Sequence, residues 1–213
     1  MSSNKSTPAE ERGALRPQRR PGQERVAALL EAAAAIIAEK GYDGATMAEV
    51  AARAGAQIGS LYRFFPNKEL LANTLIERLH ARVADIFDAI DREAGSRPTA
   101  ALADALLNVL GDLRSDSQTI VALLEGSSEL SARRLEFRRE IRKRIAQTLI
   151  KHCPKLRRPH ADDVAAVLLQ SMKSVGALTK EIDNGVRGAA LSELGVMTRH
   201  YLEKTFEDAG CRK

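Results

Sequence analysis

The sequence has no tryptophan, two cysteines, and no hydrophobic run close to the length of a membrane-spanning helix. Such a helix needs about 18 consecutive apolar residues, so none is expected. The N-terminal segment lacks the apolar core of a secretory signal, which favours a cytoplasmic location. Cys153 and Cys211 are far apart and form no CxxC motif, so we expect free thiols in a reducing cytosol. A chain of 213 residues is long enough to build a core without a disulfide or a metal.

The signature motifs of common enzyme classes are also missing. The sequence contains no P-loop, no GxGxxG, no GxSxG and no HExxH. The four histidines are dispersed, and the adjacent His152 and Cys153 would point to different sides of a helix; the histidines are His80, His152, His160 and His200. We therefore expect no enzymatic activity, no cofactor and no metal site.

Positive charge is unevenly distributed along the chain. The net charge is +5 and the isoelectric point is about 9.4, which permits a polyanionic partner without requiring one. Residues 133–158 contain eleven lysines or arginines against two glutamates. The simplest interpretation of this basic run is a solvated helix face. An anionic effector, a second DNA contact or a membrane surface are the alternatives.

Apolar residues recur at helical spacing through most of the chain, and no segment alternates as a strand does. The pattern predicts an all-α fold of about nine helices, over residues 24–40, 47–54, 58–65, 70–90, 99–110, 118–125, 129–152, 162–184 and 191–208. Thr99 is the expected N-cap of the fifth helix. Residues 1–22, rich in Ser, Pro, Gly and Arg, are expected to form a disordered basic arm.

Two short helices around Gly55 are the most informative part of the sequence. Thr46 and Glu49 have the spacing of a capping box at the start of the first helix, and Gly55 suits the turn of a helix-turn-helix. In the second helix, Phe64 and Phe65 are expected to pack in the core. The outward-facing residues of this helix combine hydrogen-bonding, small and apolar groups that suit a DNA major groove: Gln57, Ile58, Gly59, Ser60, Tyr62 and Arg63.

The stretch TMAEVAARAGAQIGSLYRFFPNKELL, residues 46–71, resembles the DNA-binding signature of the tetracycline-repressor (TetR/AcrR) family. The preceding helix and its GYDGAT continuation also match. The resemblance implies a DNA-binding domain over residues 23–69 and a domain for effector binding and dimerisation over residues 70–213. It implies phosphate contacts by Thr46, Tyr62 and Lys68, and base contacts by Gln57, Ile58, Gly59 and Ser60. Gly59 departs from the Ala, Pro or Lys more usual at its position, which removes a possible base contact.

The resemblance further implies a homodimer that binds a palindromic operator in double-stranded DNA and responds to a small-molecule effector. The last two helices match the dimer interface of the family, with an apolar centre expected at Leu168, Met172, Val175, Leu194, Met197 and Tyr201. The implied effector pocket is expected to be lined by Leu106, Leu110, Leu123, Phe137, Ile141, Met172 and Val175. For each of these side chains, ordinary core packing is the competing interpretation.

The resemblance thus predicts a sequence-specific transcriptional regulator, most often a repressor that a ligand releases from its operator. A transcriptional activator of the same family is the first alternative. A non-specific architectural DNA-binding protein and a ligand-binding protein that has lost DNA recognition are the others. Selective binding of one DNA sequence, with release by a ligand, distinguishes a regulator from the last two.

Overall fold

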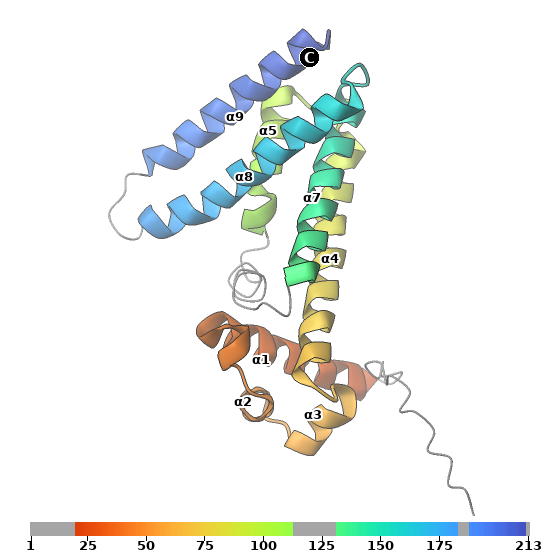
Figure 1. Cartoon of the computed structure of the whole chain (residues 1–213), viewed down its shortest axis with the longest axis vertical. Coiled ribbons are helices and arrows are strands. Elements are labelled where there is room, and N and C mark those ends of the chain that lie inside the picture. The colour runs from red at the N-terminus through yellow and green to blue at the C-terminus, as the bar shows by residue number, and fades with distance from the viewer. Residues whose placement is uncertain (1–19, 113–130, 183–187, 212–213) are drawn as a thin grey trace, which may run out of the picture. The chain divides into compact units, whose positions relative to one another are not determined.

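The computed structural model of the chain describes residues 20–112, 131–182 and 188–211 (Figure 1). Within these residues it contains eight α-helices and no strand, which confirms the expected all-α fold. The helices are α1 (Arg20–Gly44), α2 (Met47–Arg53), α3 (Ile58–Phe64), α4 (Lys68–Glu93), α5 (Thr99–Asp112), α7 (Ser131–His152), α8 (Arg158–Ile182) and α9 (Ala189–Asp208). The short helix expected over residues 118–125 lies outside the described residues.

The described chain divides into two compact units. The first unit contains residues 20–78, and the second contains residues 79–112, 131–182 and 188–211. The division falls within α4, which begins in the first unit and ends in the second. Of the expected N-terminal arm, residues 1–19 lie outside the described part of the chain, and residues 20–22 form the first turn of α1.

In the first unit, the long helix α1 packs against α2, and α2 packs against α3. The buried side of α1 includes Leu29, Ala33, Ile36 and Ile37, which recur at helical spacing. Gly41 interrupts this helix, just beyond the range of 24–40 expected from the sequence, with a φ of 75°. Glycine adopts this left-handed conformation without the strain that a side chain would add. The chain can therefore turn from α1 toward α2 within a few residues.

The second unit is a helical bundle in which α5 packs against α8 and α9, and α7 packs against α8. The helices α8 and α9 also pack against each other, and they lie side by side in Figure 1. Phe87, Leu106, Ile145 and Phe206 are among the buried side chains of this unit. Burial of side chains of this size contributes about 1.5–3 kcal/mol each. The bundle therefore has an apolar core of its own.

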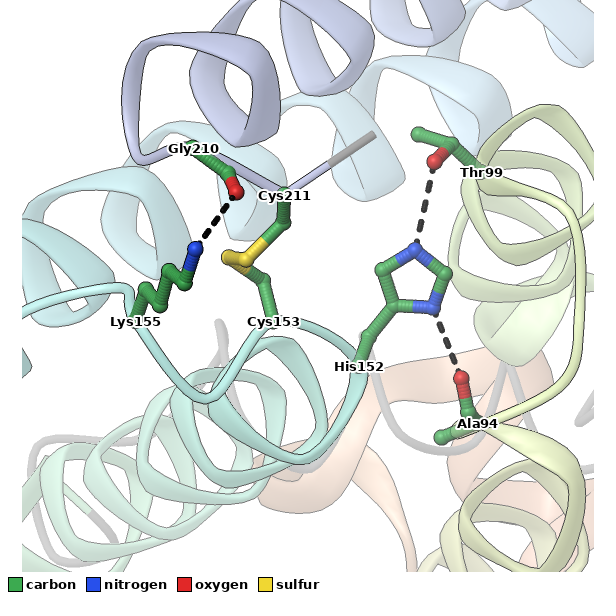
Figure 2. Close-up of a disulfide and its surroundings, with 7 residues drawn as sticks. All are labelled: Ala94, Thr99, His152, Cys153, Lys155, Gly210 and Cys211. Atoms are coloured by element: carbon green, nitrogen blue, oxygen red, sulfur yellow. Dashed lines mark hydrogen bonds between the residues drawn. A yellow bond between two sulfur atoms is a disulfide. The ribbon is translucent and has the colours of Figure 1, made fainter. Parts of the chain in front are cut away.

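Buried polar contacts join the end of α4 to α5 and α7. The ring of His152 is almost fully buried, with Nδ1 2.7 Å from the carbonyl oxygen of Ala94 and Nε2 3.2 Å from Thr99 Oγ1 (Figure 2). Because a carbonyl can only accept, Nδ1 carries the proton and the Thr99 hydroxyl donates to Nε2. The expectation that Thr99 caps its helix is therefore wrong: α5 begins at Thr99 itself, and the hydroxyl is used by His152.

The two cysteines form a disulfide between Cys153 and Cys211, with a Cα–Cα distance of 5.8 Å (Figure 2). The expectation of free thiols is therefore wrong. The residues are 58 positions apart, but the loop after α7 and the segment after α9 meet at the same end of the bundle. Sequence separation carries no information about this distance, because the packing of α7, α8 and α9 decides it.

Helix α8 begins at Arg158 rather than at residue 162 as expected. Pro159 lies in the first turn, where its missing N–H has no intrahelical partner to lose. The Ala161 amide donates to the Arg157 carbonyl at 2.9 Å, which closes the first turn around this proline. None of the helices described here is both long enough and apolar enough to cross a membrane.

Candidate nucleic-acid interface

The first short helix, α2, begins with the capping box that the sequence predicts. The Glu49 amide donates to Thr46 Oγ1 at 3.3 Å, and the Thr46 amide donates to Glu49 Oε2 at 3.1 Å. An ion pair with Lys40, together with the hydroxyl and amide of Thr46, lowers the pKa of Glu49 from 4.5 to about 2. The carboxylate therefore links the start of α2 to α1 and stays ionised at neutral pH.

The turn between α2 and α3 depends on Gly55, which has a φ of 61°. Its amide donates to the Ala52 carbonyl at 3.1 Å, and the Ala56 amide donates to the Ala51 carbonyl at 2.9 Å. This pairing satisfies carbonyls at the end of α2 while the chain reverses into α3. Only glycine occupies the left-handed region routinely, so Gly55 allows the chain to turn sharply between the two helices.

Helix α3 has one buried face and one exposed face. Leu61 and Phe64 are buried, as is Phe65 at its C-cap, which confirms the expected core packing of both phenylalanines. On the opposite side, 43% of Ile58 and 48% of Tyr62 are accessible to solvent. Ile58 and Tyr62 lie one helical turn apart, so together they form a small exposed apolar patch that is available to a partner.

The other residues expected on this surface of α3 are also accessible. Gln57 is the N-cap of α3 but makes no side-chain capping bond, so its amide group is available to a ligand. Gly59 is exposed, with open space where a side chain would begin, and Ser60 is half-buried. The guanidinium of Arg63 lies 4.8 Å from the centre of the Phe64 ring. We call Gln57, Ile58, Gly59, Ser60 and Tyr62 the α3 surface.

Lys68 has a structural role that the sequence does not reveal. Its Nζ donates to the carbonyl oxygens of Tyr42, Asp43 and Ala45 at 3.0, 3.3 and 3.2 Å. It also lies 4.5 Å from the centre of the Tyr42 ring. An ammonium has three protons, so these carbonyls can use all of them. Lys68 therefore joins the start of α4 to the end of α1, and its contact with a phosphate stays a prediction.

The residues predicted to line an effector pocket lie in the second unit, and several of them belong to its core. Leu106, Phe137, Ile141 and Met172 are all buried, and Val175 is half-buried. The ring of Phe137 stacks on His80, with the ring centres 4.9 Å apart. Leu123 and the side chain of Leu110 lie outside the part that the structure describes, so the predicted set is only partly placed.

The residues predicted to form a dimer interface separate into two groups. Leu168 and Met172 are buried within the subunit, whereas Met197 and Tyr201 on α9 are 59% and 37% exposed. Val175 and Leu194 are half-buried. Val167 on α8, which the sequence did not single out, is 49% exposed. Residues 167 and 168 are adjacent and so lie on different faces of α8.

The basic run of α7 is partly neutralised by acidic neighbours. Arg144 forms an ion pair with Asp88 on α4, and Lys143 lies 3.9 Å from Glu140. Arg139 and Arg142 are exposed to solvent. This pattern is compatible with the simplest interpretation, a solvated helix face around an apolar stripe.

Helix-turn-helix geometry in the first unit and a separate helical bundle in the second define a protein with a helix-turn-helix domain followed by an all-helical domain. Residues 29–75 match the family model of bacterial regulatory proteins of the tetR family. The match assigns these residues, which include α2, α3 and the turn between them, to that family.

Similarity to individual proteins supports this assignment. The HTH-type transcriptional regulator TtgR of Pseudomonas putida is 30% identical over 105 residues, which are 49% of this chain and 50% of TtgR. The chain spans about half the length of the curated relatives it matches.

Solved structures show the same fold over most of the chain. A transcriptional regulator from Aquifex aeolicus VF5 has a TM-score of 0.65 at 24% identity, covering 85% of this chain and 99% of that one. The SmeT–triclosan complex has a TM-score of 0.61 at 18% identity, covering 85% of this chain and 91% of SmeT.

Proposed function

We propose that this chain is a transcriptional regulator that binds a specific sequence in double-stranded DNA through the α3 surface. The observation that carries the proposal is the exposure of Ile58 and Tyr62 on a helix whose other face is buried. A capping box and a glycine turn hold that helix in place. Such a helix fits a major groove, where its N-terminal residues meet base edges.

Each residue of the α3 surface has a chemical role in this proposal. The amide of Gln57 matches the paired donor and acceptor of adenine, and Ile58 suits the methyl group of thymine. Gly59 allows the backbone to approach the bases closely. The hydroxyls of Thr46 and Tyr62 suit phosphate contacts, which position the helix without reading the sequence.

The protein is proposed to act as a homodimer on a palindromic operator. A single short helix reads few base pairs, and a two-fold dimer doubles the site. The exposed apolar side chains Val167, Met197 and Tyr201, on neighbouring helices α8 and α9, supply a surface for self-association.

A small molecule bound in the second unit is proposed to release the repressor from DNA. The SmeT structure, which has the same fold, was solved as a complex with triclosan. A ligand changes DNA affinity only to the extent that it binds one conformation better than the other. A repressor in the cytoplasm is the function proposed here, and an activator is the alternative.

Selection from a pool of random duplexes at roughly 150 mM salt tests the proposal directly, because non-specific binding is weak there. We expect an inverted repeat to be enriched. Replacing Gln57 by Ala should weaken binding to that repeat by roughly 5- to 150-fold, the usual effect of losing one paired base contact. Gln147→Ala is the matched control, because this exposed glutamine lies on α7, a helix outside the proposed DNA and dimer surfaces. A folded protein that enriches no motif would refute specific regulation and favour an architectural role.

A further inference from the structure

The C-terminal end of α9 is attached to the corner between α7 and α8. Cys153, in the loop after α7, is fully buried, and Cys211, which follows the end of α9, is half-buried. Beside their disulfide, Lys155 Nζ donates to the Gly210 carbonyl at 3.2 Å (Figure 2). The Cys211 amide donates to the Phe206 carbonyl at 2.7 Å. Covalent and polar contacts therefore hold the same few residues.

The attachment concerns a helix whose buried side chains lie toward its C-terminal end, from Thr198 to Phe206. Leu202 and Phe206 are buried, and the ring of Phe206 packs 4.7 Å from that of His152. Closer to the N-terminus of the same helix, Met197 is exposed. Releasing the C-terminal end of α9 would thus loosen the segment that anchors this helix to the bundle.

We propose that Cys153 and Cys211 form a reversible thiol–disulfide pair, and that its oxidation clamps α9 to the corner between α7 and α8. The clamp makes the stability of the second unit depend on the redox state of the cell. Because α9 carries part of the apolar surface assigned above to dimerisation, the clamp also stabilises the dimer. That last step rests on the proposed function, whereas the clamp itself does not.

The difference in burial determines the order of the chemical steps. Cys211 is the accessible thiol, so its thiolate attacks a peroxide oxygen, and the O–O bond breaks to give a sulfenic acid and one water. The thiolate of Cys153 then attacks the sulfur of Cys211. The S–S bond forms, the S–O bond breaks, and a second water leaves. Two thiols lose two electrons and two protons in total, and hydrogen peroxide is reduced to two waters.

A dithiol reductant reverses the reaction. Its thiolate attacks the sulfur of Cys211, and Cys153 leaves as a thiolate that takes up a proton. The second thiolate of the reductant then attacks the reductant sulfur of this mixed disulfide. Cys211 leaves as a thiolate that takes up a proton, and the reductant is released as a cyclic disulfide. In a cytosolic protein, disulfides are usually reversible bonds of this kind.

The length of the closed loop sets the size of the expected effect. A disulfide across 58 residues removes much of the freedom of the unfolded chain. For a protein of this size, the melting temperature of the oxidised form should exceed that of the reduced form by roughly 10 °C. The clamp is then among the larger contributions that a single bond makes to this unit.

The experiment equilibrates the folded full-length chain in glutathione buffers that span the cytosolic redox range. Free thiols are counted by alkylation and mass spectrometry, and the melting temperature is measured on the same samples. We expect two thiols under reducing conditions, none under oxidising conditions, and a melting temperature that follows the thiol count. The double variant Cys153→Ser/Cys211→Ser should melt at one temperature in every buffer.

Three results would overturn the proposal. The thiols could stay free in the most oxidising buffer, the disulfide could persist in the most reducing one, or both forms could melt at the same temperature. If the double variant does not fold, Cys211→Ser serves instead, because it leaves the buried Cys153 in place. None of these measurements uses DNA, so failure of the clamp and failure of the proposed function are separate outcomes. Light scattering on both forms then tests the effect on the dimer.

Discussion

Gly55, in the turn between α2 and α3, and Gly59, within α3, should respond in opposite ways to replacement by alanine. Gly59 lies within α3, and Gly55 lies in the turn with a φ of 61°. A Cβ added at either position meets no atom within 4 Å. Steric contacts therefore cannot explain a difference between Gly59→Ala and Gly55→Ala, and only backbone conformation remains.

The magnitudes follow from that conformation. In a helix interior, alanine is more favourable than glycine by about 1 kcal/mol, so Gly59→Ala should raise the free energy of unfolding by about that amount. In the left-handed region, a side chain costs about 1–2 kcal/mol, so Gly55→Ala should lower it. The free energies of unfolding of the two variants should then differ by about 2–3 kcal/mol, with Gly59→Ala above the parent protein and Gly55→Ala below it.

Urea unfolding followed by far-ultraviolet circular dichroism measures this difference, and hydrogen exchange of residues 46–66 shows whether it arises in the helix-turn-helix. Two units are present, so the exchange data are needed to assign the change to the first. Equal stability of the two variants, or a loss of stability in Gly59→Ala, would refute the reasoning. A loss of stability in Gly59→Ala would mean that α3 is not a regular helix at Gly59.

Three other predictions concern charge and exposure. The pKa of Glu49 is lowered in the folded state to about 2, so its contribution to stability is present above pH 4.5 and is lost as the pH falls toward 2. Between pH 4.5 and 2, the free energy of unfolding should fall less steeply in Glu49→Gln than in the parent protein. Equal slopes in the two proteins would contradict the ion pair between Glu49 and Lys40. Lys68→Met should lower the free energy of unfolding by about 1–3 kcal/mol, since three carbonyls lose their donor; a lysine that serves phosphate alone would leave it unchanged. Met197→Glu should convert the proposed dimer to a monomer in light scattering, whereas Leu135→Glu, on a side chain of α7 with comparable exposure, should not.

Local features of the first unit were predictable because they depend on residues close in the sequence. The capping box joins residues three positions apart, and Gly55 sets the turn through its own φ. The burial of Phe64 and the exposure of Tyr62 follow from helical spacing alone. The class of protein is carried by the same short segment, which is why it could be identified from residues 46–71.

Contacts between distant segments were decided only by the tertiary structure. The use of Lys68 as a donor to the end of α1, and of the Thr99 hydroxyl by His152, depends on how whole helices pack. The same holds for the pairing of Cys153 with Cys211. A hydrophobic pattern marks the buried stripe of a helix, but it does not say which partner covers that stripe. The spacing of residues within one helix predicts which side of that helix is buried. Distances between segments far apart in the sequence depend on the packing of several helices at once.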